Sequence, residues 1–131
     1  MAPAKYGDLV SYDLMLFRPP DNTNPEVASL ELDDILDGRR TWPWREVRAE
    51  EREARTRLAG LGRVVQRHRD VLVLLLPDER DRCRARAVIR AALPHLEALA
   101  AIGFQIEDPQ QDRRLRFPTD AIALTTAYAG F

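Results

Sequence analysis

Two short runs of the chain are apolar on both faces. Residues 10–17 alternate only in part between apolar and polar positions, and residues 71–76 are apolar throughout. A strand with two apolar faces is typical of the interior of a sheet that is covered on both sides. We therefore predict a central strand at each place. Residues 63–68 predict another strand, which either continues into residues 71–76 or turns back at Arg69 and Asp70 to form a hairpin.

Apolar residues recur at helical spacing in three further segments, and two of these segments lie before residues 71–76. An Asn-Pro-Glu sequence at residues 24–26 predicts a helix start, with a cap residue, a proline in the first position and an acid in the first turn. Gly38 is the expected end of this helix. A second helix is predicted to begin near Thr41 or Trp42 and to end at the glycines of residues 60–62.

The third and longest helix is predicted to open at residues 77–79 and to stop at Gly103. Pro94 lies inside the pattern and is expected to kink the helix or to divide it in two. Cys83 falls on the expected buried stripe, where a thiol is usually inert packing. The predicted stripe consists of Cys83, Ile89, Leu93, Leu96 and Ala100, with the polar Arg86 at the remaining position of the spacing.

Two further strands are expected at residues 104–107 and 113–117, joined by a turn, and residues 121–131 contain enough apolar side chains to pack on the body. The order of elements predicts an α+β fold with a central, mostly antiparallel sheet and about three helices packed on one face. This arrangement resembles a split β-α-β unit. We expect one globular domain over residues 1–131.

Composition restricts the binding partners and the cellular location that we expect for the chain. Its 131 residues are 45% hydrophobic and 31% charged, with a net charge of −1, so no bulk charge attracts nucleic acid or membrane. The six apolar residues at 71–76 are too few to cross a bilayer, and residues 1–10 lack a signal-peptide pattern. We expect a cytoplasmic protein with no membrane partner. Nineteen arginines against the single Lys5 are typical of a GC-rich bacterial genome.

Residues for bond-making chemistry or cofactor binding are sparse. His68, His95 and Cys83 are the only soft or borderline metal ligands, and both histidines are expected at the surface rather than at a metal. The glycine pair at residues 60–62 ends a helix instead of opening one, and Lys5 has no phosphate-binding context. The sequence predicts no enzyme, no metal and no cofactor.

Adjacent acids occur twice, and both pairs have ordinary explanations. Asp33 and Asp34 would point in different directions from a helix, which is typical of a solvated face. Glu107 and Asp108 end a strand ahead of a proline, where acids are common in turns. A small-molecule enzyme would instead need an arginine-lined anion site, for which Arg63, Arg67 or Arg116 are the candidates.

Charge is segregated along the chain. Residues 1–38 carry two basic and eight acidic side chains, whereas residues 39–69 carry ten arginines and four glutamates. A shared arginine face over residues 45–69 would suit a nucleic-acid-binding domain, which is the alternative hypothesis. Glutamates one helical turn away can instead pair with these arginines, and this second interpretation is favoured.

Both tryptophans lie in one segment, Trp42-Pro43-Trp44, next to Arg39 and Arg40. Tryptophan and arginine are enriched at binding hot spots, although a tryptophan at a helix entry also commonly packs into the core. The candidate interface residues are Arg39, Arg40, Trp42, Trp44, Arg48, Arg52 and Arg55, with Asp108 and Gln110 as secondary candidates.

Two pieces of the sequence are similar to a known group of proteins. Residues 10–20 with the Asn-Pro-Glu helix start, and the Leu-Pro-His-Leu segment at 93–96 running into residues 103–110, resemble small uncharacterised bacterial proteins found near polymorphic-toxin loci. Some proteins of this kind behave like immunity proteins. The resemblance implies a toxin-neutralising binding protein. The leading hypothesis is therefore a non-enzymatic protein-binding domain whose partner is another protein, and the resemblance implies a toxin as that partner.

Overall fold

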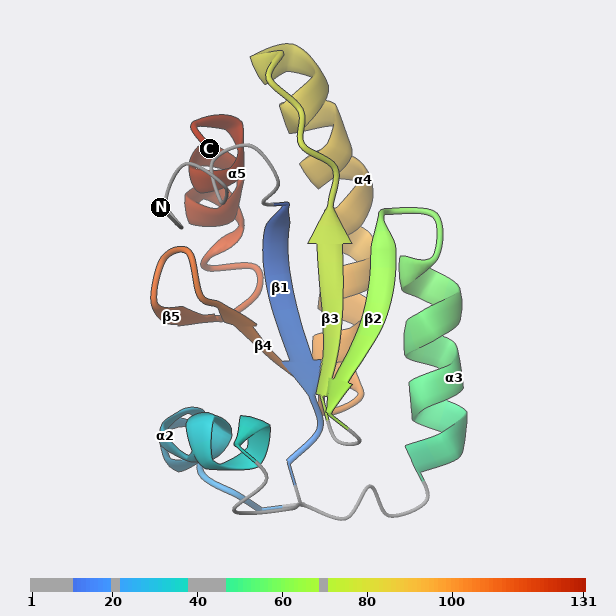
Figure 1. Ribbon diagram of the computed structural model, residues 1–131, viewed down its shortest axis with the longest axis vertical. Coiled ribbons are helices and arrows are strands. Elements are labelled where there is room, and N and C mark those ends of the chain that lie inside the picture. The colour runs from blue at the N-terminus through green and yellow to red at the C-terminus, as the bar shows by residue number, and fades with distance from the viewer. Residues whose placement is uncertain (1–10, 20–21, 38–46, 69–70) are drawn as a thin grey trace.

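An antiparallel sheet organises the computed structural model, which describes residues 11–19, 22–37, 47–68 and 71–131 (Figure 1). Within these residues the sheet has five strands in the order β2-β3-β1-β4-β5, and each neighbouring pair is antiparallel. The strands are β1 (Tyr12–Phe17), β2 (Arg63–His68), β3 (Val71–Leu76), β4 (Gln105–Asp108) and β5 (Arg113–Leu115). The helices are α2 (Pro25–Leu36), α3 (Val47–Leu58), α4 (Arg82–Ala101) and α5 (Ala121–Ala129).

The predicted split β-α-β unit is present. Strand β1 lies between β3 and β4 and is antiparallel to both, so β3 and β4 run parallel to each other. Helix α4 connects β3 to β4, and β1 fills the gap between them (Figure 1). The β2–β3 pairing confirms the hairpin alternative for residues 63–76.

Alternating residues of β1 reach two different cores, as expected for a strand covered on both faces. Leu14 and Leu16 pack with residues of α3, α4 and α5, whereas Met15 and Phe17 pack with Ala28 and Leu32 of α2. Three helices, α3, α4 and α5, therefore share one face of the sheet, which is the predicted number. The predicted set was different, because it included the helix that begins at Asn24 and lacked α5. The fourth, α2, covers part of the opposite face.

Helix α2 begins where the Asn-Pro-Glu sequence predicts. The Asn24 side-chain oxygen accepts a hydrogen bond from the Glu26 backbone nitrogen at 2.8 Å, which satisfies one of the free N–H groups at the helix start. The buried side of the helix carries Ala28 and Leu32, and its position on the sheet follows from their contacts with Met15 and Val73.

Helix α4 begins later than predicted and is not divided. Its cap is Asp81, whose side chain accepts hydrogen bonds from the backbone nitrogens of Cys83 at 2.8 Å and Arg84 at 3.2 Å. The helix continues through Pro94, so the alternative of two separate helices is wrong. Pro94 is exposed, which leaves the carbonyl that loses its helical hydrogen bond on the solvent side.

The predicted buried stripe of α4 is wrong at Cys83, which is exposed. Two of the positions that are buried instead, Ala85 and Ala92, are small alanines that the predicted stripe did not include. Cys83 lies two residues before the buried Ala85, so at about 100° per residue its side chain points away from the side of the helix that faces the sheet. The buried residues of α4 are Ala85, Ile89, Ala92, Leu96 and Leu99.

We expect Cys83 to react with a thiol reagent such as Ellman's reagent in the folded protein, at a rate close to that of a short unstructured peptide. One equivalent should react without denaturant, because the side chain is exposed. A thiol that reacts only after unfolding would contradict this placement.

Residues 121–129 form a helix, α5, where the sequence predicted only that the segment packs. Leu124 and Tyr128 are buried, and the rings of Tyr128 and Phe131 lie edge-on to Tyr12 with centroid separations of 5.5 and 5.2 Å. The Tyr128 hydroxyl donates a hydrogen bond to the carbonyl of Pro77. Among the described residues, no helix combines the length and apolarity needed to cross a membrane.

Candidate functional site

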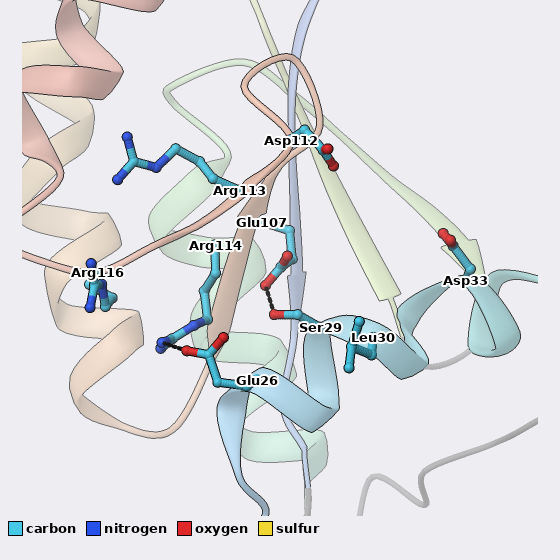
Figure 2. A pocket seen from close by; sticks show the side chains of 9 residues that line it. All are labelled: Glu26, Ser29, Leu30, Asp33, Glu107, Asp112, Arg113, Arg114 and Arg116. Carbon is cyan, nitrogen blue, oxygen red and sulfur yellow. Dashed lines mark hydrogen bonds and ion pairs between the residues drawn. The ribbon is translucent and has the colours of Figure 1, made fainter.

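An open groove of about 520 Å³ lies between α2 and the β4–β5 hairpin (Figure 2). One wall comes from the outer side of α2, and the other comes from β4, β5 and the residues that flank β5. The lining residues are Glu26, Ser29, Leu30, Asp33, Glu107, Asp112, Arg113, Arg114 and Arg116.

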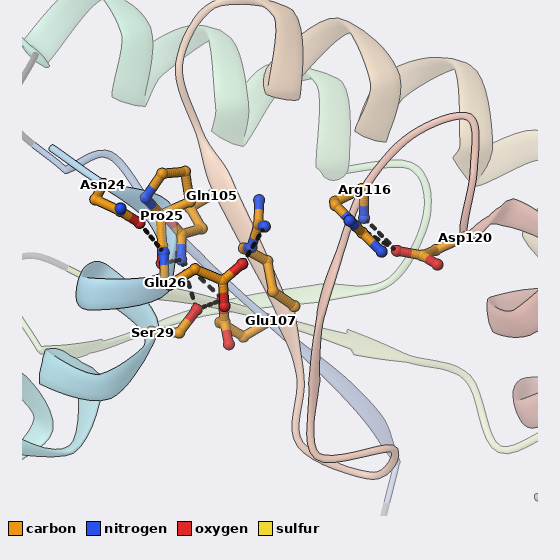
Figure 3. A network of polar contacts seen from close by, with 9 residues as sticks. Asn24, Pro25, Glu26, Ser29, Gln105, Glu107, Arg116 and Asp120 are labelled. Carbon is orange, nitrogen blue, oxygen red and sulfur yellow. Dashed lines mark hydrogen bonds and ion pairs between the residues drawn. The ribbon is translucent and has the colours of Figure 1, made fainter. Parts of the chain in front are cut away.

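Hydrogen bonds between Ser29 and β4 fix the position of α2 at this groove. The Ser29 hydroxyl donates to Glu107 Oε2 at 2.9 Å. The Gln105 side-chain nitrogen lies 2.8 Å from Ser29 Oγ and 3.0 Å from the Pro25 carbonyl oxygen (Figure 3). Gln105 and Glu107 both project toward α2 because they are two residues apart on one strand. The helix is thus anchored to the sheet by polar contacts as well as by its apolar side.

The arginines at one end of the groove already have acidic partners. Arg114 Nη2 lies 3.0 Å from Glu26 Oε1, which joins β5 to α2. Asp120, only 4% exposed, accepts from Arg113 Nη2 at 2.8 Å and from the Arg116 backbone nitrogen at 2.7 Å. The Arg116 guanidinium is 3.7 Å from the same carboxylate. Two carboxylates thus face three guanidinium groups, and because Arg113 and Arg116 share Asp120, one positive charge is left over at this end.

Two carboxylates face the groove from opposite walls. Asp33 projects from α2 and Asp112 from the β4–β5 turn, and both side chains are exposed (Figure 2). Neither carboxylate makes a hydrogen bond or ion pair with any residue in the described ranges. These two carboxylates outweigh the single surplus arginine charge, so the net charge left uncompensated along the groove is acidic.

The outer side of α2 also carries two apolar side chains. Leu30 is 81% exposed and Val27 is 44% exposed, and Leu30 forms part of the groove rim. The helix has four acidic residues and no basic residue over Pro25–Leu36. We call Glu26, Val27, Leu30 and Asp33 the acidic face of α2; they lie on the side of the helix away from Ala28 and Leu32.

Glu107 sits at the floor of the groove, and burial raises the pKa of its carboxyl, partly offset by the Gln105, Ser29 and Arg114 contacts. A raised folded-state pKa means that the protonated form favours folding. This contribution is complete below the unfolded-state pKa and is lost as the pH rises through the folded-state value. Ionised Glu107 therefore reduces stability at neutral pH.

Replacing Glu107 by Gln should raise the thermal midpoint at pH 7, because the amide keeps an acceptor for Ser29 and has no charge to desolvate. The difference from the unsubstituted protein should shrink toward pH 4. Thermal melts from pH 4 to pH 8 measure it, with the exposed Glu97→Gln as the matched control. A Glu107→Gln protein that is less stable than the parent at pH 7 would contradict this prediction.

The secondary candidates Asp108 and Gln110 come together, in a network that supports the fold. Asp108 is fully buried. Its carboxylate accepts from the Tyr12 hydroxyl at 2.5 Å, the Gln110 backbone nitrogen at 2.9 Å and the Gln111 side-chain nitrogen at 2.6 Å. The Gln110 amide also bonds to the backbone of Asp13, accepting from its nitrogen at 2.9 Å and donating to its oxygen at 2.7 Å. The pair thus ties the β4–β5 turn to β1.

The described residues include only some of the other predicted interface residues. Arg52 and Arg55 lie on α3, Arg52 being exposed, and Arg48 belongs to the same helix although its side chain lies outside the described residues. The rest, Arg39, Arg40, Trp42 and Trp44, lie outside the described residues.

Helix α3 is close to electrically balanced. Arg55 lies 3.8 Å from Glu51 and donates to Gln66 at 2.9 Å, and Arg57 lies 3.9 Å from Glu53. These pairs agree with the interpretation in which glutamates one turn away offset the arginines. They leave a smaller positive surface for the nucleic-acid alternative than the sequence count suggests.

Of the arginines considered as alternatives for an anion site, Arg116 lines this groove. Arg63 lies on β2, at the opposite edge of the sheet, and the side chain of Arg67 lies outside the described residues. The three alternatives therefore lie at opposite edges of the sheet, with Arg63 and Arg67 on β2 and Arg116 just after β5.

Most of the groove could not be predicted from the sequence, because its walls come from segments about eighty residues apart. One signal was present: α2 has apolar residues on two sides, with Ala28 and Leu32 on one and Val27 and Leu30 on the other. A short helix on a sheet can bury only one side. The second apolar side of α2 therefore indicates apolar side chains that stay exposed in the folded chain.

His95, one of the metal-ligand candidates considered from the sequence, is half-buried on α4. Within the described ranges, no group of three or more His, Cys, Asp or Glu side chains is placed to hold a metal ion.

No protein-family model matches the chain, and searches of curated proteins and of solved structures find no match. A proposal for the function therefore has to rest on the sequence and on the groove.

Proposed function

We propose that this chain is a protein-binding domain and that it neutralises a toxin in the manner of an immunity protein. The observation that carries the proposal is the exposure of Leu30, 81%, beside Val27, 44%, at the rim of the groove. Neighbouring exposed apolar side chains framed by polar residues are typical of interaction surfaces. The resemblance of residues 10–20, and of residues 93–96 with 103–110, to immunity-like bacterial proteins is consistent with this role.

Burial energetics make Leu30 a useful contact. Covering a leucine side chain contributes about 1.5–3 kcal/mol, so one well-seated leucine changes a dissociation constant by roughly tenfold to a hundredfold. Helix α2 is anchored by Ser29 and by the Arg114–Glu26 pair, so little conformational freedom is lost when a partner docks.

The test is to express the chain together with the products of its neighbouring genes. We expect one of them to arrest growth alone, to be neutralised by this chain, and to co-purify with it. Leu30→Ala should weaken the complex at least about tenfold. Ile122→Ala is the matched control, since Ile122 on α5 is equally exposed at 81% and should leave binding unchanged.

Two results would count against the proposal. The first is that none of the neighbouring products binds the chain. The second is that a neighbouring product binds but its activity is unaffected, which would leave a binding protein without the neutralising role.

A further inference from the structure

The acidic face of α2 has a chemistry that specifies its partner more closely than protein binding alone. Leu30 lies at its centre, with Val27 beside it and the carboxylates of Glu26 and Asp33 one turn to either side. Asp112 adds a further carboxylate across the groove. An apolar centre with an acidic rim has the general layout of a recognition patch.

Charge decides which surfaces can cover this patch. Of its carboxylates, Glu26 is shared with Arg114, while Asp33 and Asp112 have no ion pair within the described part of the chain. Docking removes water from these groups, so a neutral partner would leave the negative charges without compensation. An acidic partner or a phosphate backbone would be repelled.

We infer that the acidic face of α2 docks onto a basic protein surface, with Leu30 entering an apolar depression bordered by arginine or lysine side chains. This inference rests on the proposed protein-binding role and names the partner's chemistry. The partner's cations face Asp33 and Asp112 on the two walls of the groove. A second copy that met this face through a two-fold axis would set carboxylates against carboxylates, so a symmetric dimer through this face is disfavoured and we assign the face to a different, basic protein.

Peptide display on the full-length chain tests the inference even while the natural partner is unidentified. A random twelve-residue library is selected against the unsubstituted protein at low salt. We expect the enriched peptides to combine at least two basic residues with one large apolar residue. Their binding should weaken as salt rises, because exposed ion pairs are screened.

Matched substitutions locate the binding site. Leu30→Ala should lower the affinity of the enriched peptides about tenfold, and Asp33→Lys should lower it by a comparable factor. Two control variants should retain the affinity. Ile122→Ala changes a residue of α5 that is as exposed as Leu30, and Glu97→Lys changes an exposed acid of α4.

Enrichment of acidic or neutral peptides would overturn the inference, as would no enrichment, or basic peptides whose affinity is unchanged by Leu30→Ala. Failure here is distinguishable from failure of the proposed function. A neighbouring toxin that binds elsewhere on the chain would retain the function and remove the inference. Basic peptides bound at α2, with no neighbouring product neutralised, would do the reverse.

Discussion

Replacing Asp108 by Ala should destabilise the folded chain by about 3 kcal/mol, because a fully buried carboxylate with several donors is removed. The Tyr12 hydroxyl loses its acceptor in a region closed to water. Burial raises the pKa of Tyr12, and the Asp108 contact raises it further, so the hydroxyl remains a proton donor throughout the neutral range. An unpaired buried donor costs about 1–3 kcal/mol by itself.

Chemical denaturation of two variants measures this effect. Asp108→Asn keeps the shape but replaces one acceptor oxygen by an amide nitrogen, which cannot accept from these donors. Because the other oxygen still accepts, we expect a smaller loss than for alanine, about 1–2 kcal/mol. The control is Asp112→Asn in the same turn, whose exposed carboxylate has no partner among the described residues, and which should change stability by less than about 0.5 kcal/mol. If Asp108→Asn were as stable as the control, Asp108 would not be the structural centre of this turn.

Replacing Gly62 by Ala should cost about 3 kcal/mol or prevent folding, because the added methyl group has no space. Its carbon would lie 2.3 Å from the carbonyl oxygen of Leu75 and 3.1 Å from the carbonyl carbon. Both atoms are backbone atoms of β3, which is held between β2 and β1 and cannot withdraw. The hairpin therefore requires glycine immediately before β2.

Gly60 offers the matched substitution two positions earlier. A methyl group there meets nothing within 4 Å, so Gly60→Ala should change stability by less than about 0.5 kcal/mol. Thermal melts and urea titrations of the two alanine variants give the comparison. Equal stabilities would show that β2 can move away from β3 at low cost.

Several parts of the fold could be predicted because local pattern determines them. Strands β1 and β3 are apolar on both faces and do lie inside the sheet, between other strands and beneath helices. The start of α2 follows from the capping chemistry of Asn24. Helix α5 was missed because its nine residues contain no charge, so no polar side marks it as amphipathic.

The parts that could not be predicted depend on contacts between distant residues. Asp108 was interpreted as an ordinary turn acid, since nothing near it in the sequence reveals the Tyr12 hydroxyl from β1. Cys83 was placed on a buried stripe because alanines, which fit closest to the sheet in α4, carry a weak hydrophobic signal. The groove needs α2 and β5 to meet, and only the strand order brings them together.

The central place of β1 has a consequence for how fast the molecule acquires its structure. Met15 pairs with both Val73 and Glu107, so the two ladders of this strand close loops of roughly sixty and ninety residues. The β2–β3 hairpin can form locally, but the sheet is incomplete until β1 enters. Refolding from denaturant should therefore be limited by this late insertion and take roughly milliseconds to seconds.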